Sequence, residues 1–75
     1  MLNKKIKWKC RRGVLELDRV LMNFYDKNIN ILTNDQVDNF NKLLDLEDPL
    51  LLEWLVYKQP ALPDYLEIVA LINKS

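Results

Sequence analysis

RRGVLELD, residues 11–18, contains the only glycine of this 75-residue chain and lies where a basic segment gives way to an acidic, amphipathic one. Glycine adopts positive φ and lets another backbone approach closely, so a lone glycine in a helix-rich sequence predicts a break between two helices. Two guanidinium groups precede Gly13, and a carboxylate follows it three residues later. We therefore expect a compact polar recognition surface in this stretch, which we call the Gly13 joint (residues 11–18).

Helical spacing extends in both directions from the joint, and no segment alternates with period two for long enough to predict a strand. A capping box at Thr33 and Gln36 predicts the start of a third helix, and Asp48 as cap with Pro49 at the first helical position predicts a fourth, which ends at residues 59–63. The inward-facing residues expected on the five helices are, in chain order, Leu2, Ile6 and Cys10; Leu17, Val20, Leu21 and Phe24; Val37, Phe40, Leu43 and Leu44; Leu51, Trp54 and Leu55; and Leu62, Tyr65, Leu66, Val69 and Ile72. We predict an all-α fold, a compact antiparallel five-helix bundle in which residues 1–75 form a single domain.

Composition excludes several classes of protein. A 9.0 kDa chain has a small core and little room for a large ligand cavity. The single cysteine cannot form an internal disulfide, and no apolar run approaches the roughly 18 residues that span a bilayer, so we expect a soluble, intracellular protein without membrane insertion. Histidine is absent, which removes the commonest general base and metal ligand. We therefore expect a protein that is not an enzyme and holds no metal.

The charges are segregated although they sum to zero. The first 15 residues contain no acid, and the remainder carries five basic and eleven acidic residues, a net charge of −6. Such asymmetry is typical of a nucleic-acid arm or of a surface for an anionic partner, and a solvated basic helix that aids solubility is the alternative. The six cations of the first segment are Lys4, Lys5, Lys7, Lys9, Arg11 and Arg12.

The charged residues of the joint allow two interpretations. In the structural one, Gly13 is an N-cap, Glu16 reaches back to its N–H, and both arginines are solvated. In the functional one, the guanidinium groups of Arg11 and Arg12 bind carboxylates or phosphates of a partner, and Gly13 lets that partner approach the main chain. The two roles are compatible, because a capping Glu16 keeps acceptor capacity.

Other candidate sites are better explained by structure. Asp45, Glu47 and Asp48 invite a metal interpretation, but the spacing of a Ca²⁺ loop is missing and capping with solvation is favoured. Cys10 beside two cations could be a reactive thiol, yet without a partner base a half-buried, ordinary thiol is favoured. One glycine excludes a phosphate-binding loop or a dinucleotide fingerprint, so another protein must hold most of any flavin or nucleotide. Packing in the core and at its rim is expected for the aromatic residues at helical spacings, Trp8 (turned away from the first apolar face), Trp54, Tyr57 and Tyr65.

IKWKCRRGVLELD, residues 6–18, closely resembles the start of the succinate dehydrogenase assembly factor family, also called the flavinators of succinate dehydrogenase. The family hallmark Arg-Gly-x-x-Glu falls on Arg12, Gly13 and Glu16. A second similar block is LDLEDPLLLEWL, residues 44–55, and the resemblance covers nearly the whole chain.

The resemblance implies a non-catalytic assembly factor that binds the flavoprotein subunit of succinate dehydrogenase, or for some members that of fumarate reductase. Such a factor promotes covalent attachment of FAD to a histidine of the partner, and it holds no cofactor itself. A chain without histidine cannot be the acceptor. We expect a monomer from the bacterial cytoplasm, or from the mitochondrial matrix if the chain is a processed form. The partner-binding residues implied are Trp8, Arg11, Arg12, Gly13, Glu16 and Asp18.

Two departures from the family pattern are the end of the chain at Ser75, without a longer polar tail, and the lack of a long N-terminal extension. The rival interpretations are a nucleic-acid-binding module that uses the basic first helix and a small regulator that binds another protein. Against nucleic acid, the remaining −6 would repel phosphates, and the arginines cluster at one joint.

Overall fold

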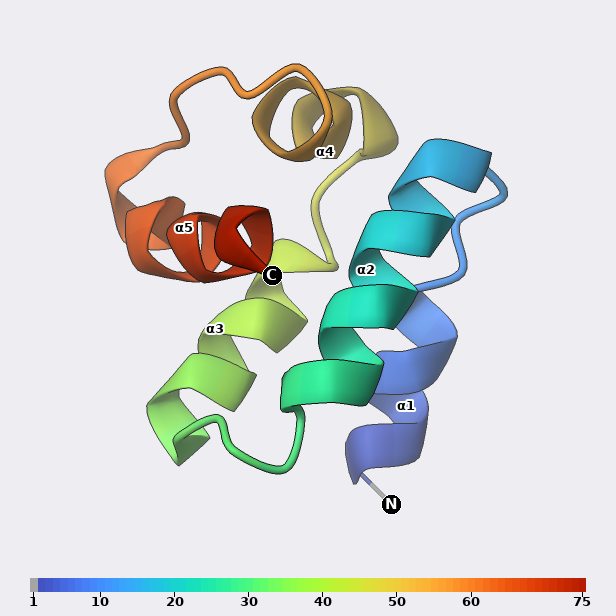
Figure 1. Cartoon of the computed structure of the whole chain (residues 1–75), viewed down its shortest axis with the longest axis vertical. Helices are drawn as coiled ribbons and strands as arrows, with labels where there is room; N and C mark the ends of the chain where they lie inside the picture. The colour runs from blue at the N-terminus through green and yellow to red at the C-terminus, as the bar shows by residue number, and fades with distance from the viewer. Residues whose placement is uncertain (1) are drawn as a thin grey trace.

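A computed structural model describes the backbone of residues 2–75 and the side chains from residue 4 onward (Figure 1). The elements in chain order are α1 (Leu2–Lys9), α2 (Leu15–Asn28), α3 (Asn34–Leu43), α4 (Asp48–Leu55), the short 3₁₀ helix η1 (Pro63–Tyr65) and α5 (Leu66–Lys74). No strand occurs among the described residues, so the predicted all-α class is confirmed. No helix in this part of the chain is long and apolar enough to cross a bilayer.

The helices are packed at several angles. In Figure 1, α1 and α2 run side by side in opposite directions, whereas α4 is seen nearly end-on and crosses the others. Contacts join α2 to α4 and α5, α4 to α5, and α3 to α5. In the same view α3 runs against α2, so α1, α2 and α3 alternate in direction as an antiparallel bundle predicts, and the crossing of α4 is the departure from that prediction. The Cα radius of gyration is 11.1 Å.

The starts of α3 and α4 differ in how well they were predicted. Thr33 and Gln36 form the predicted capping box, with the Gln36 backbone N–H donating to Thr33 Oγ1 over 3.1 Å and the Thr33 N–H donating to Gln36 Oε1 over 2.9 Å. Asp48, expected as the cap of α4, is instead its first helical residue, and Glu47 is the N-cap. No side chain caps this helix, and the Asp48 carboxylate accepts a hydrogen bond from Arg12 Nε.

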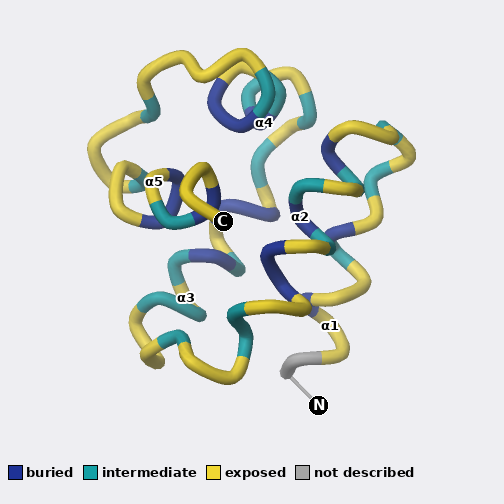
Figure 2. The backbone as a smooth tube through the Cα atoms, viewed as in Figure 1, coloured by how far each residue is buried: buried dark blue, intermediate teal, exposed yellow. Residues whose placement is uncertain are grey.

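One core cluster lies between the helices (Figure 2). The expected inward residues of α2, α3 and α4 lie in or against this core, and Ile6 and Cys10 are fully buried. The side chain of Leu2 lies outside the described side chains. The fully or nearly buried residues are Ile6, Cys10, Leu17, Leu21, Phe24, Tyr25, Phe40, Leu43, Leu44, Leu51, Trp54, Leu55, Ile68, Val69 and Ile72.

The apolar face of α5 was predicted partly wrong. Leu62 and Leu66 are exposed, whereas Ile68, which the expected stripe omits, is buried. Leu62 has an extended backbone before η1, so the helical register begins later than the sequence spacing suggests. The buried face then follows Ile68, Val69 and Ile72.

Candidate functional site

The Gly13 joint is a sharp turn between α1 and α2. Gly13 has φ +81°, a left-handed backbone conformation that side chains with a Cβ rarely adopt. The residue is exposed, and a Cβ placed on it would meet no atom within 4 Å. Glycine is therefore needed here for the backbone conformation, and the space where a Cβ would stand is open.

The guanidinium group of Arg12 points inward from the joint to the connection between α3 and α4. Nε donates to Asp48 Oδ1 over 2.7 Å, and one Nη donates to the Leu46 carbonyl over 2.6 Å. The other Nη donates to the carbonyls of Lys9 and Leu44. Four of the five guanidinium N–H groups thus have partners in the chain, and only 14% of the side chain is exposed. The interpretation of Arg12 as a solvated arginine is wrong.

The carboxylate that closes the joint belongs to Asp18. Asp18 Oδ1 accepts the Arg12 backbone N–H over 2.6 Å from the first turn of α2. The N-cap of α2 is Val14, which makes no side-chain cap. The expectation that Gly13 is the N-cap and Glu16 its capping partner is therefore wrong, and Glu16 is exposed.

The acidic residues after α3 pair with the basic segment. Lys9 Nζ donates to Asp45 Oδ1 over 2.7 Å and to Asn41 Oδ1 over 2.9 Å, next to the Arg12–Asp48 pair. These two ion pairs connect the end of α1 and the joint to the connection between α3 and α4. The described residues contain no group of acids and cysteine that could hold a metal ion. Solvation was expected for Asp45, Glu47 and Asp48, and Asp45 and Glu47 are exposed, but no side chain caps α4, and Asp45 and Asp48 form ion pairs that the sequence did not reveal.

Cys10 is a structural residue. It is fully buried and not half-buried as expected, and its Sγ donates to the Ile6 carbonyl over 3.4 Å. Burial raises the pKa of the thiol from 9.0 to about 12, although the positive charge of Arg12 acts in the opposite direction. A thiol held protonated in this way is a poor nucleophile, which excludes a reactive thiol at neutral pH.

The outer side of the joint carries exposed residues. Trp8 is 79% exposed, so the expectation that its indole packs in the core or at its rim is wrong. Arg11, Gly13 and Glu16 are exposed as well. Leu15, which sequence analysis did not select, is 67% exposed. The sequence could have indicated this, because Leu15 does not belong to the apolar stripe of α2 and lies two residues after Gly13.

The six residues expected to bind a partner thus form two groups, one facing the interior of the protein and one facing solvent. Arg12 and Asp18 face inward and hold the joint together. The four that face outward are Trp8, Arg11, Gly13 and Glu16.

Comparison of the sequence with known proteins shows which family the chain belongs to. Residues 4–75 match the family described as flavinator of succinate dehydrogenase. The chain is 43% identical over 75 residues to the FAD assembly factor SdhE of Coxiella burnetii, covering 99% of this chain and 92% of that protein. It is 44% identical over 69 residues to the protein of the same name from Legionella pneumophila strain Lens, covering 92% and 87%. No solved structure matches the chain significantly.

Proposed function

The chain belongs to the family of flavinators of succinate dehydrogenase, whose members include proteins named FAD assembly factor, and from this premise we propose how it acts. It binds the flavoprotein subunit of succinate dehydrogenase, or the related subunit of fumarate reductase. It then promotes covalent attachment of FAD to a histidine of that subunit. We place it among bacterial proteins, because the relatives named above are bacterial, and we propose that it acts in the cytoplasm as a monomer.

The observation that carries this proposal is the open main chain at Gly13, which has no neighbouring atom where a Cβ would stand. The exposed side chains around it are an aromatic ring, a guanidinium group and a carboxylate, from Trp8, Arg11 and Glu16. Trp and Arg are the residues that most often dominate the free energy of protein association. These residues bind the partner directly.

Arg12 and Asp18 serve the partner indirectly, as positioning residues. Asp18 holds the Arg12 backbone N–H, and the Arg12 side chain ties the turn to Leu46 and Asp48. This network fixes the left-handed turn at Gly13 before the partner arrives. A preformed surface binds more tightly, because less conformational entropy is lost on binding.

The contribution of this chain to covalent flavinylation is positional. It has no histidine to accept the flavin, and its one thiol is buried and protonated. The flavin supplies the chemistry of bond formation within the partner. By binding the partner, the chain holds its domains so that the bound flavin lies against the acceptor histidine, and such orientation alone can lower a barrier substantially.

A reconstitution tests the proposal. Purified apo flavoprotein subunit is incubated with FAD, with or without this protein, and covalent flavin is measured by fluorescence of the denatured partner band. We expect a stoichiometric complex and much faster flavinylation when the protein is present. Equal rates with and without it, in the absence of any complex, would refute the proposed function.

Variants at Glu16 and Gly13 separate recognition from folding. Glu16→Ala removes an exposed carboxylate, so we expect the melting temperature to change by at most about 3 °C while flavinylation falls severely. Asn tolerates positive φ better than Ala, so Gly13→Asn is expected to lose less stability than Gly13→Ala and yet to impair flavinylation more, because its side chain blocks the approach. If flavinylation by Gly13→Asn and Gly13→Ala falls in proportion to their loss of stability, Gly13 is needed for the backbone conformation alone.

A further inference from the structure

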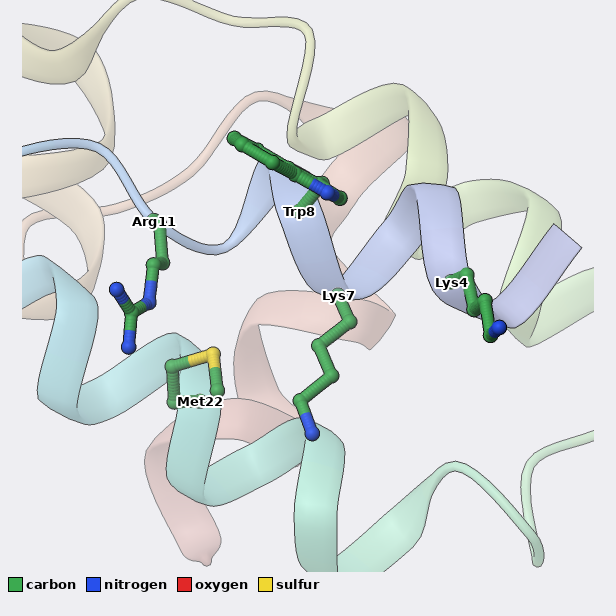
Figure 3. Close-up of a pocket in the computed structure, with 5 residues that line it drawn as sticks. All are labelled: Lys4, Lys7, Trp8, Arg11 and Met22. Atoms are coloured by element: carbon green, nitrogen blue, oxygen red, sulfur yellow. The ribbon is translucent and has the colours of Figure 1, made fainter. Parts of the chain in front are cut away.

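A shallow basic hollow of about 460 Å³ lies beside the joint, between α1 and α2. The residues that line it are Lys4, Lys7, Trp8, Arg11 and Met22 (Figure 3). In Figure 3, the side chains of Lys7 and Arg11 extend from the N-terminal segment toward α2, where Met22 lies. No carboxylate is among the lining residues.

The helical register produces this hollow. Lys4, Lys7 and Trp8 follow the spacing i, i+3, i+4, which places them on one face of α1, and Arg11 follows in the turn after the helix. The buried face of the same segment runs through Ile6 and Cys10, so the hollow looks outward.

Some cations of the basic segment form ion pairs within the protein, and others do not. Lys9 and Arg12 are paired with Asp45 and Asp48. Among the described residues, no ion pair engages Lys4, Lys7 or Arg11. Three positive charges therefore converge on a surface that contains no acid of its own, in a chain whose total charge is zero.

We propose that this hollow docks an acidic segment of the flavoprotein partner, one that inserts an apolar side chain against Trp8 and Met22. This inference rests on the proposed function and adds a second contact area, with Lys4, Lys7 and Met22, to the Gly13 joint. An indole that is 79% exposed loses much contact with water when a partner covers it, and the three cations that line the hollow with it attract carboxylates. Electrostatic complementarity of this kind raises the rate of association. The Trp8 indole, once the partner covers it, slows dissociation.

A protein segment fits the hollow better than a free dinucleotide does. The hollow is open to solvent, and its cationic groups are side chains on flexible stems. The chain has one glycine and hence no loop of backbone N–H groups to cradle a pyrophosphate. Arg11 belongs both to the hollow and to the joint, and this continuity puts the hollow at the edge of one larger interface.

Binding kinetics with the apo flavoprotein subunit test the inference. Lys4→Glu/Lys7→Glu is expected to slow association about tenfold at low salt, with a smaller difference at about 0.5 M salt. Trp8→Ala is expected to raise the Kd at least about tenfold, mainly through faster dissociation. The matched control Lys5→Glu/Lys27→Glu changes the net charge equally on exposed residues outside the hollow, and it should change association about threefold or less.

The outcomes are distinguishable from failure of the proposed function. If the unaltered protein forms no complex and promotes no flavinylation, the proposed function fails. If it does both, but the hollow variants behave like the control, the docking inference alone is overturned. Saturable binding of FAD to the protein by itself, abolished by Lys4→Glu/Lys7→Glu, would also overturn it, in favour of a small-molecule anion site. All variants alter exposed side chains, so circular dichroism should report unchanged helicity and melting.

Discussion

Arg12→Ala should destabilise this protein strongly, whereas the neighbouring Arg11→Ala should leave its stability almost unchanged. The two arginines are adjacent and carry the same charge, but Arg11 is exposed and Arg12 is tied into the fold. Truncation of Arg12 removes the donor for Asp48 Oδ1 and for the carbonyls of Leu44 and Leu46. These three contacts join the joint to a segment more than 30 residues later in the chain.

The size of the loss follows from those contacts. Hydrogen bonds to a charged group contribute roughly 1.5–3 kcal/mol each, but water can reach part of this site, since 34% of the Asp48 side chain is exposed. Discounting for that access, we expect a loss of about 2–4 kcal/mol in the free energy of unfolding. For a domain of this size, 1 kcal/mol lowers the melting temperature by about 4–8 °C, so a decrease of about 8–32 °C is expected.

Urea unfolding followed by circular dichroism measures the loss, and Arg11→Ala serves as the matched control, expected within about 0.5 kcal/mol of the original protein. Arg12→Lys keeps the charge without the planar fork and should fall between the two. A double-mutant cycle of Arg12→Ala with Asp48→Asn should give a coupling energy of about 1 kcal/mol or more. An Arg12→Ala variant as stable as Arg11→Ala would refute the inward role of this side chain.

Three further predictions follow from the core and the charges. Because the folded Cys10 thiol keeps its proton up to about pH 12 and an unfolded thiol only to about pH 9, stability should fall as pH rises between these values, and Cys10→Ala should remove that part of the slope in pH-dependent urea unfolding. Trp54→Ala should cost about 3–5 kcal/mol in thermal unfolding, since the indole is 3% exposed and packs 5.6 Å from the Tyr65 ring, and a loss below 1 kcal/mol would contradict this packing. Duplex DNA at about 0.15 M salt should bind weakly and without sequence preference in a fluorescence anisotropy titration, and tight, specific binding would favour the nucleic-acid alternative.

The ends of several helices could be predicted from the sequence because a cap or a glycine break depends on only a few neighbouring residues. The capping box of Thr33 and Gln36 needs only a hydroxyl and an amide at the right spacing, and it is confirmed. The break at Gly13 is confirmed for the same reason, since only glycine readily adopts its φ. The start of α5 was misplaced because the 3₁₀ turn after Pro63 shifts the helical phase, and sequence spacing does not reveal such a shift.

The site was harder to predict because its organisation depends on contacts between distant segments. Arg11 and Arg12 are equivalent in sequence, and only the position of the connection between α3 and α4 makes one of them internal. Asp48, which accepts from Arg12, and Asp45, which accepts from Lys9, were visible in the sequence as part of an acidic cluster, but their spacing alone pointed to capping. Ion pairing of Asp48, as opposed to capping, follows from the 2.7 Å distance between its Oδ1 and Arg12 Nε, which depends on the tertiary fold.

The inward pairing of Lys9 and Arg12 also changes how the charge asymmetry should act. Two of the six cations in the basic segment are paired with Asp45 and Asp48, so the positive charge that this segment leaves unpaired resides on the four others. Three of those four line one hollow, and the fourth, Lys5, is exposed elsewhere on α1. The positive potential is therefore concentrated on one patch next to Gly13. A stripe of phosphates requires cations spread along a groove, whereas a compact patch with a tryptophan among its lining residues suits a short acidic segment of a protein. The same two ion pairs that stabilise the joint thus leave its outer face selective for a protein partner.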